Sequence, residues 1–498
     1  MGARRIAIIG AGFGGLGMAV RLQQAGYRDL VVLDKADHIG GTWRDNTYPG
    51  AACDVPSHLY SFSFHPGRWT RRYSQQPEIL AYLEELVRAH GLERYLRLGT
   101  EVRSVTWDDG ADRWRLALND GDELDADAVV SGVGQLNRPF VPDFPGLDDF
   151  EGPSWHSARW RHDVDLAGRR VGVVGTGASA IQFVPHLAEA AEHVTVFQRS
   201  APYLLPREDR PYGHRHQRMQ ARAPWLFKVP RASQYLRLEL VTHAFTRESG
   251  LRKALHQKWR EMLHEQVPDP ALREALIPDY PMGCKRVLVS DEWYPTLMRE
   301  DVRLVPRPVT RVTADGVVDA DGAHHPCDAL VFGTGFRTLE FLVPMQVRGR
   351  DGRDLHEYWH EGAEAYRGTT VAGFPNLFLL YGPNTNLGSN SIIFILESQF
   401  EYVLAQLRTL DEEGLAWADV TDDAQARFNA DVEQRSRQTV FEGGCESWYT
   451  TADGRNTNNW PGYTFQFRHL TRRIDLSDHV VMPRRTRERI PAYATVGG

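Results

Sequence analysis

The sequence predicts an α/β fold that contains two copies of a strand–turn–helix–strand unit, the second copy inserted into the first. Three observations carry this prediction. An apolar strand runs into a glycine-rich turn at residues 5–15 and again at residues 170–180, and each turn leads into a helix with an apolar stripe. Two further apolar segments, residues 127–134 and 328–335, resemble each other, and both end in glycines. Such strands commonly return the chain from one unit to the other, which is why we expect an insertion.

Length and composition describe an ordinary globular protein. The 498 residues suffice for two or three domains, and 42% of them are hydrophobic and 25% charged. A formal net charge of -7 argues against a protein that binds nucleic acid mainly through phosphate contacts. We find no signal peptide and no apolar run of membrane-spanning length, so we expect a cytoplasmic protein without a membrane partner.

The four cysteines give no sign of redox or metal chemistry. Cys53, Cys284, Cys327 and Cys445 lie far apart, and no two of them form a C-x-x-C pair. We therefore expect buried thiols, and neither a redox dithiol nor a zinc site.

The first unit carries the pattern of a Rossmann-like dinucleotide-binding motif. Gly10 permits the sharp turn, Gly12 lets backbone N–H groups approach a pyrophosphate, and Gly15 lets the helix pack closely on the strand. Asp34 follows Gly15 by 19 residues and ends the second strand, where a carboxylate accepts hydrogen bonds from ribose hydroxyls. An adenosine without a 2′-phosphate fits this unit.

The second unit repeats the turn at residues 175–180 but lacks the acid. The residue 19 positions beyond Ala180 is Arg199, which stands between Gln198 and Ser200, so that a cation and two neutral donors replace the acid. A carboxylate would repel a 2′-phosphate, whereas a guanidinium binds one through paired, charge-assisted hydrogen bonds. The two units together predict FAD on the first and NADPH on the second.

We predict three segments along the chain. Residues 1–145 form the first part of the FAD-binding domain, residues 146–345 form the NADPH-binding domain, and residues 346–498 form the second part of the FAD-binding domain with a C-terminal segment. A helical insertion at about 207–282 is rich in arginine and aromatic residues. We place it near the substrate entrance and interpret its basic residues as a solvated face.

Three motifs resemble those of type I Baeyer–Villiger monooxygenases. Residues 150–160 read F-E-G-P-S-W-H-S-A-R-W, similar to the fingerprint F-x-G-x-x-x-H-x-x-x-W, which in that family also precedes the NADPH-binding glycines. The family pattern ends in Pro or Asp where this chain has Arg161, so the exact subgroup stays open. Residues 40–54 match a second family signature without departure. Lys285 and Arg286 look like the pair at which the family places its active-site arginine.

The resemblance implies an FAD- and NADPH-dependent monooxygenase that converts a ketone to an ester or lactone through a C4a-peroxyflavin. Such chemistry needs a fixed cation beside the developing negative charge. Arg286 is the candidate, because a guanidinium does not give up a proton at working pH. Asp54 is expected to orient Arg286 by hydrogen bonding. The expected partners are a ketone and O2; the ketone's identity and the oligomeric state stay open.

The predicted cofactor-binding residues follow from the motifs and the resemblance. They are Gly10, Gly12, Phe13, Gly15, Asp34, Lys35, Gly41, Thr42, Trp43, Ala52, Cys53, Asp54, Tyr60, Val102, Gly175, Thr176, Gly177, Ala178, Ser179, Ala180, Gln182, Arg199, Ser200, Lys285, Arg286, Asn390 and Trp448. Lys285 is expected to share the 2′-phosphate with Arg199. For Trp43, Tyr60 and a further aromatic, Tyr48, packing along the flavin and ordinary core packing both stay open. His156 is interpreted as part of a domain linker without an acid–base role.

Two other functions stay open at this point. A flavin monooxygenase that oxygenates nitrogen or sulfur would share both nucleotide units, although it needs a protonated rather than an anionic oxygen adduct. A flavoprotein without turnover would bind FAD and oxidise no NADPH. A flavin disulfide reductase would need a vicinal dithiol, which the sequence lacks.

Overall fold

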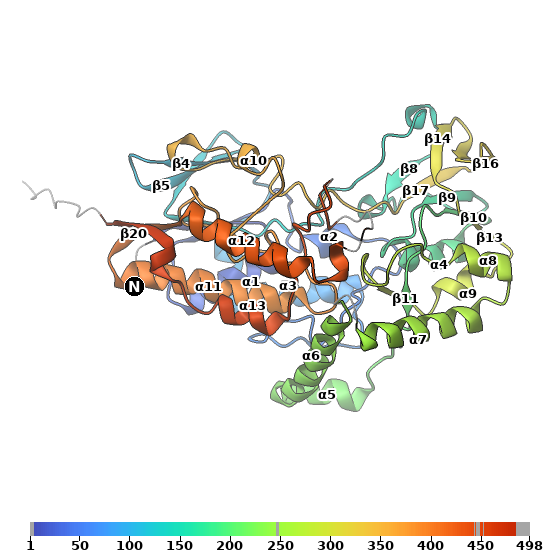
Figure 1. The fold of residues 1–498 in the computed structure, drawn as a ribbon, viewed down its shortest axis with the longest axis horizontal. Helices are drawn as coiled ribbons and strands as arrows, with labels where there is room; N and C mark the ends of the chain where they lie inside the picture. The colour runs from blue at the N-terminus through green and yellow to red at the C-terminus, as the bar shows by residue number, and fades with distance from the viewer. Residues whose placement is uncertain (1–3, 246–248, 443, 445–448, 452, 485–498) are drawn as a thin grey trace, which may run out of the picture.

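A computed structural model of the chain describes residues 4–245, 249–442, 444, 449–451 and 453–484. Its centre consists of two parallel five-stranded sheets that lie in separate lobes, with helices α5 (His214–Arg222) and α6 (Lys228–Thr242) projecting from the underside (Figure 1). The predicted fold class is confirmed. None of the helices in the described ranges is both long enough and apolar enough to cross a bilayer.

The first sheet takes its strands from both ends of the chain. In spatial order it consists of β19 (Leu377–Leu379), β7 (Ala128–Ser131), β1 (Ile6–Ile9), β2 (Leu30–Leu33) and β3 (Leu96–Arg97). All neighbouring strands are parallel. Strands β1 and β7 are buried throughout, as expected for a parallel sheet covered on both faces.

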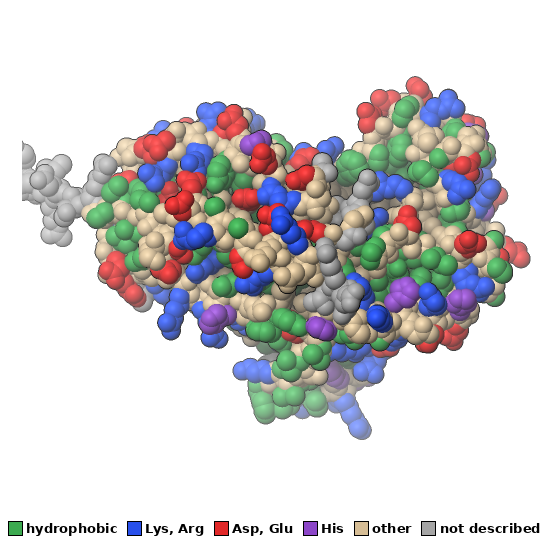
Figure 2. Space-filling model, viewed as in Figure 1, with side chains coloured by type: hydrophobic (Ala, Val, Ile, Leu, Met, Phe, Trp, Pro, Cys, Tyr) green, Lys and Arg blue, Asp and Glu red, His purple; other side chains and the backbone are tan. Residues whose placement is uncertain are grey.

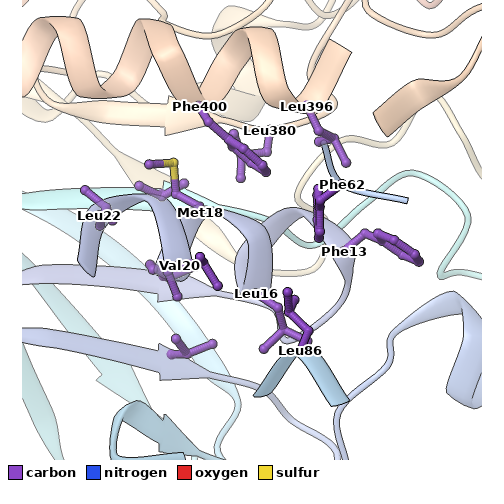
Figure 3. Packing of buried hydrophobic residues seen from close by; sticks show 14 of the residues in the cluster. Phe13, Leu16, Met18, Val20, Leu22, Phe62, Leu86, Leu380, Leu396 and Phe400 are labelled. Atoms are coloured by element: carbon purple, nitrogen blue, oxygen red, sulfur yellow. The ribbon is translucent and has the colours of Figure 1, made fainter. Parts of the chain in front are cut away.

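Helices α1 (Phe13–Gln24), α3 (Gln76–His90) and α11 (Ile392–Glu412) form the core of this lobe with the sheet. Figure 3 shows Leu396 and Phe400 of α11 reaching α1 from one side, while Leu86 of α3 approaches it from the other. Each such side chain that is fully buried contributes roughly 1.5–3 kcal/mol. The glycine turn that precedes α1 is therefore held in place by a well-packed helix.

The second sheet belongs to the other lobe. Its order is β13 (Val302–Val305), β10 (His193–Phe197), β9 (Arg170–Val174), β17 (Ala329–Phe332) and β8 (Ser154–His156), and all pairs are parallel. Helices α4 (Ala180–Ala190) and α9 (Trp293–Leu297) pack in a separate hydrophobic core with this sheet.

Smaller elements surround the two sheets. The strands are β4 (Val102–Asp108), β5 (Arg113–Leu118), β6 (Glu123–Ala126) and β18 (Gln346–Arg348) in one sheet, β14 (Val309–Thr313), β15 (Gly316–Asp319) and β16 (His324–Pro326) in another, and the pairs β11 (Leu204–Leu205) with β12 (Leu288–Val289) and β20 (Leu415–Val420) with β21 (His479–Pro483). The helices are α2 (Thr42–Asp45), α5 (His214–Arg222), α6 (Lys228–Thr242), α7 (Gly250–Gln266), α8 (Pro270–Ala275), α10 (Leu355–Tyr358), α12 (Asp422–Ser436) and α13 (Thr464–Leu470).

The repeated strand–glycine segments have the same structural role in both lobes. A Cβ atom on Gly10 would lie 2.6 Å from the carbonyl oxygen of Gly132, and a Cβ atom on Gly175 would lie 2.6 Å from that of Gly333. Both turn glycines have positive φ angles, 104° and 105°. The returning strand therefore passes directly behind each glycine turn, and only glycine satisfies both the space and the backbone angle.

One sequence expectation about cysteine is wrong. Cys284 is disulfide-bonded, whereas Cys53 and Cys327 are buried free thiols as expected. Cys445 lies outside the described residues. Spacing along the chain gave no signal for a disulfide, because disulfide geometry depends on Cα separation in the fold.

Candidate active site

One large cavity is lined by residues of both nucleotide units and has a volume of about 1730 Å³. Pockets for a single small ligand usually measure about 300–1,000 Å³, so this one is large enough for two nucleotides. Apart from Gly15, Ala180 and Trp448, every residue predicted to bind a cofactor lies in its wall. Trp448 lies outside the described residues.

Gly15 and Ala180 stand behind the turns instead of in the cavity wall. A Cβ atom on Gly15 would lie 1.8 Å from the carbonyl oxygen of Gly10, and the corresponding small residue Ala180 packs against Gly333. Their contribution is close packing of helix on strand, as the motif predicts.

The first glycine turn lies against a second glycine-rich segment. A Cβ atom on Gly41 would come within 3.2 Å of the Gly12 Cα atom, so side chains at these positions would fill the space between two stretches of backbone. Both glycines line the cavity. Because neither glycine has a side chain, a ligand can approach the backbone closely here. A diphosphate fits such a place, since it binds through close contact with backbone N–H groups.

Asp34 directly follows β2 beside this turn, where the sequence predicts a ribose ligand. Its carboxylate accepts hydrogen bonds from the backbone N–H groups of Ala11 at 2.8 Å and Ala36 at 2.9 Å. Arg44, which no sequence motif indicates as a site residue, also donates to it at 3.3 Å. These contacts fix the carboxylate and leave part of its acceptor capacity for a ligand.

Cations gather at the second turn. Arg199 is exposed and lines the cavity, and the Lys285 ammonium donates to Ser200 Oγ at 3.2 Å although 85 residues separate the two in the chain. The same ammonium lies 4.5 Å from the centre of the Tyr280 ring. Two cations beside a hydroxyl fit a phosphate group.

Gln198 does not join these donors. Its side-chain amide is buried, and Nε2 donates to the carbonyl oxygen of Ala275 at 2.7 Å. The expectation that neutral donors flank Arg199 on both sides is therefore wrong on the Gln198 side, because that side chain points into the protein.

Arg286 and Asp54 form an ion pair in the cavity wall. Nε and Nη2 of Arg286 donate to Asp54 Oδ2 at 3.0 and 2.6 Å, across 232 residues of sequence. The neighbouring carboxylate raises the pKa of Arg286 above its already high ordinary value, so its charge is permanent in the working pH range. Within the described part of the chain, Nη1 has no hydrogen-bond partner and is left for a ligand.

Buried phenols surround this pair without adding negative charge. Burial raises the pKa of Tyr381 to about 12 and also raises the pKa of Tyr449. Both groups are neutral at physiological pH, so Asp54 is the anion that Arg286 meets. Nothing in the spacing of these two tyrosines along the chain relates them to Arg286, so their place beside it could not be predicted from sequence.

Trp43 and Tyr60, two of the aromatics predicted along the flavin, line the cavity together. Trp43 Nε1 donates to the Tyr60 hydroxyl at 2.9 Å, and the Tyr60 ring meets Phe13 edge-on at 5.1 Å. Tyr48 instead packs edge-on against Phe183 of α4 at 5.9 Å. It belongs to the contact between the two lobes as much as to the cavity.

Two amide side chains in the cavity wall form hydrogen bonds with other protein residues. Gln182 on α4 donates to the carbonyl oxygen of Ala52 at 3.0 Å and accepts from the Tyr48 hydroxyl at 3.0 Å, which ties the second lobe to the first. Asn390 donates to the buried carboxylate of Glu239 at 2.7 Å.

The fingerprint segment connects the lobes. His156 ends β8, opposite Phe332 of β17, and burial lowers its pKa to about 4, so it is neutral. Trp160 packs between Phe183 at 5.3 Å and Tyr48 at 6.5 Å. Arg161 points outward and pairs with exposed Asp163 at 2.5 Å, so its departure from the family pattern does not reach the cavity.

Comparison with known proteins agrees with this geometry. Residues 7–212 match the pyridine nucleotide-disulphide oxidoreductase family, although that segment contains a single cysteine, Cys53. A Baeyer–Villiger monooxygenase of Streptomyces coelicolor is 46% identical over 99% of this chain and 94% of its own length. One of Pseudomonas aeruginosa is 44% identical over 95% of this chain and 90% of its own length.

A solved structure of an oxidised steroid monooxygenase bound to NADP superposes with a TM-score of 0.84 at 31% identity and covers 96% of this chain and 99% of its own. Near-complete coverage on both sides means that the similarity extends over both lobes and the cavity between them. The chain belongs to the Baeyer–Villiger monooxygenase family and is an NADPH-dependent flavin monooxygenase.

Proposed function

We propose that this monooxygenase converts a ketone to an ester or a lactone, with Arg286 as the catalytic cation and Asp54 as the residue that positions it. The observation that carries the proposal is a permanently charged guanidinium, held by a carboxylate, in the wall of a cavity that both nucleotide turns share. One oxygen atom of O2 enters the product and the other leaves as water, with NADPH as the reductant.

Bound FAD, reduced by NADPH, supplies the activation of oxygen. The chain's own contribution is electrostatic. Attack on a carbonyl carbon places negative charge on oxygen, and a preorganised donor at that place is typically worth a factor of about 10²–10³ in rate. The Nη1 group of Arg286, which Asp54 does not use, can supply this donor without handing over a proton.

We place FAD along the first turn, with Asp34 at its ribose, and NADPH along the second turn, with Arg199, Ser200 and Lys285 at its 2′-phosphate. The support is the convergence of these groups on one cavity. The proposal includes a cytoplasmic location and the domain boundaries 1–145, 146–345 and 346–498.

Product analysis by mass spectrometry tests the reaction. The purified protein is incubated with NADPH, ¹⁸O2 and a panel of linear, cyclic, aryl and steroid ketones, together with one sulfide and one amine. One labelled oxygen in an ester or lactone supports the proposal. Labelled sulfoxide or N-oxide without any ester would assign the protein to heteroatom oxygenation, and hydrogen peroxide alone with every compound would remove Arg286 from a catalytic role.

A further inference from the structure

Helices α5 and α6, with the short 3-10 helix Pro224–Phe227 between them, present a large apolar surface to solvent. On α6, Val229, Leu236 and Leu240 are 75%, 60% and 68% exposed, and their spacing of seven and four residues places them on one face of the helix. Trp225, just ahead of the helix, is 65% exposed. Phe465 of α13, whose backbone N–H donates to Glu239 of α6, is 53% exposed. The full set, which we call the hairpin face, is Met219, Trp225, Leu226, Val229, Leu236, Leu240 and Phe465.

The opposite side of α6 is firmly attached to the body of the protein. Arg231 donates to the carbonyl oxygens of His58 at 2.7 Å and Ser61 at 2.6 Å, and Tyr235 stacks on Phe394 with ring centres 4.7 Å apart. The outward stripe is therefore not a consequence of a loosely placed helix. Contiguous exposed apolar surface of this kind marks an interaction site.

The exposed Lys, Arg, Asp and Glu side chains between residues 210 and 243 all have one sign. Between residues 210 and 243 the chain has seven Lys or Arg residues and one acid, Glu239, although the whole chain carries a formal net charge of -7. Glu239 is buried and accepts hydrogen bonds from Asn390 and Thr464, so it contributes no negative surface. The exposed cations are Arg210, Arg215, Arg218, Arg222, Lys228 and Arg237. Figure 2 shows hydrophobic side chains on this lower projection with Lys and Arg beside them.

We propose that the hairpin face docks on an anionic lipid bilayer. An apolar stripe with Trp, Leu and Phe, bordered by Lys and Arg and without exposed acids between residues 210 and 243, is the pattern of a helix that lies in the membrane interface. A second copy of the chain fits less well, because a symmetric contact would bring six exposed cations of one copy against the same six of the other. The basic residues therefore serve as a lipid-facing border instead of the solvated face expected from sequence, and the proposal replaces the expectation of a protein without a membrane partner.

Docking in this orientation places the bilayer close to the reaction cavity. Thr242 at the end of α6 shares a 2.8 Å hydrogen bond with Ser389, and Glu239 holds Asn390, which lines the cavity. One helix thus separates the lipid-facing stripe from the cavity wall. The proposal is independent of the proposed function, because lipid binding is measured without turnover.

Vesicle co-sedimentation of the FAD-loaded full chain tests the proposal. Vesicles of phosphatidylcholine alone are compared with equimolar phosphatidylcholine and phosphatidylglycerol. We expect binding to the anionic vesicles, weakened by added salt, and at least tenfold weaker binding to the neutral ones. The charge variant Arg215→Gln/Arg218→Gln/Arg222→Gln should lose about fivefold per cation, roughly hundredfold in total.

A second variant, Val229→Ser/Leu236→Ser/Leu240→Ser, should weaken binding by at least about tenfold. The matched controls are Arg303→Gln/Arg311→Gln and Ile277→Ser, which change exposed residues outside the hairpin face and should bind as the parent does. Flavin absorbance and NADPH oxidation in solution verify that each variant is folded.

Equal binding to both vesicle types, no binding at all, or variants that bind like the parent would overturn the proposal. A dimer in sedimentation equilibrium that the Val229/Leu236/Leu240 variant abolishes would also overturn it, since the face would then belong to a second copy.

Discussion

Replacing Arg286 with alanine should separate flavin reduction from oxygen insertion. The guanidinium gives two hydrogen bonds to Asp54 and leaves Nη1 for the reacting oxygen. Loss of one preorganised donor costs about 10²–10³ in rate, and charged donors are stronger than neutral ones, so we expect ester formation to fall by at least about 10³. Reduction of the flavin by NADPH should change by less than about tenfold, because Arg199 and Ser200 remain at the second turn.

Rapid-mixing spectroscopy and product quantification measure the two steps separately. Flavin bleaching after anaerobic mixing with NADPH reports reduction, and ester formed after adding oxygen and ketone reports insertion. The Arg286→Lys variant keeps the charge but loses the forked geometry and can donate a proton, so it should recover only a small part of the activity. Arg311→Ala, at an exposed position on β14, serves as the control for purification and assay.

Ester formation by Arg286→Ala within about tenfold of the parent rate would rule out this role for the guanidinium. An equal fall in reduction and insertion would also rule it out, because the arginine would then act in hydride transfer or in holding the lobes together. Asp54→Asn gives the complementary test: it keeps the shape of the contact but removes the charge that fixes Arg286, so insertion should fall more than reduction.

Three further predictions concern the cofactor turns and pH. Arg199→Glu should weaken NADPH binding by about hundredfold and NADH binding by less than about threefold, measured by the KM values for the two cofactors; an unchanged preference would remove Arg199 from the 2′-phosphate site. Gly15→Ala should lower FAD affinity by at least about tenfold, seen as lost flavin absorbance after gel filtration, since its Cβ atom would lie 1.8 Å from the Gly10 carbonyl oxygen. Burial lowers the pKa values of His58 and His156 from 6.5 to about 4. The unfolded chain therefore takes up these protons first, so the free energy of unfolding should be highest above about pH 6.5 and fall as pH approaches 4, and His156→Gln should flatten that decline in urea titrations.

The nucleotide turns could be predicted from sequence because local geometry dictates their residues. Gly10 and Gly175 need positive φ angles, and the returning segments must approach them at Gly132 and Gly333. Each requirement leaves a glycine at a fixed place in a short motif. Strand and helix bounds near these turns follow for the same reason.

The pair Arg286 and Asp54 is a different case. Composition and spacing contain nothing that relates residues 232 positions apart, and the expectation came from family resemblance. For Gln182 the sequence motif was misleading. Its place after the second turn suggested a cofactor ligand, but its side-chain amide instead joins the two lobes through hydrogen bonds with Ala52 and Tyr48. The hydrogen-bond partner of such a polar side chain depends on how the two lobes pack together. A local sequence motif contains no information about that packing.

Helix α6 shows why the lipid-facing surface could not be foreseen. It has apolar or aromatic residues on two sides: Tyr235 packs inward, whereas Val229, Leu236 and Leu240 point outward. When a helix has apolar residues on more than one side, each of those sides is usually expected to be buried. The sequence identifies such faces but cannot say which of them the rest of the chain covers. Only the folded arrangement shows that one face of α6 stays open, with six exposed cations and no exposed acid between residues 210 and 243. This combination favours an anionic bilayer over bulk solvent as the neighbour of that face.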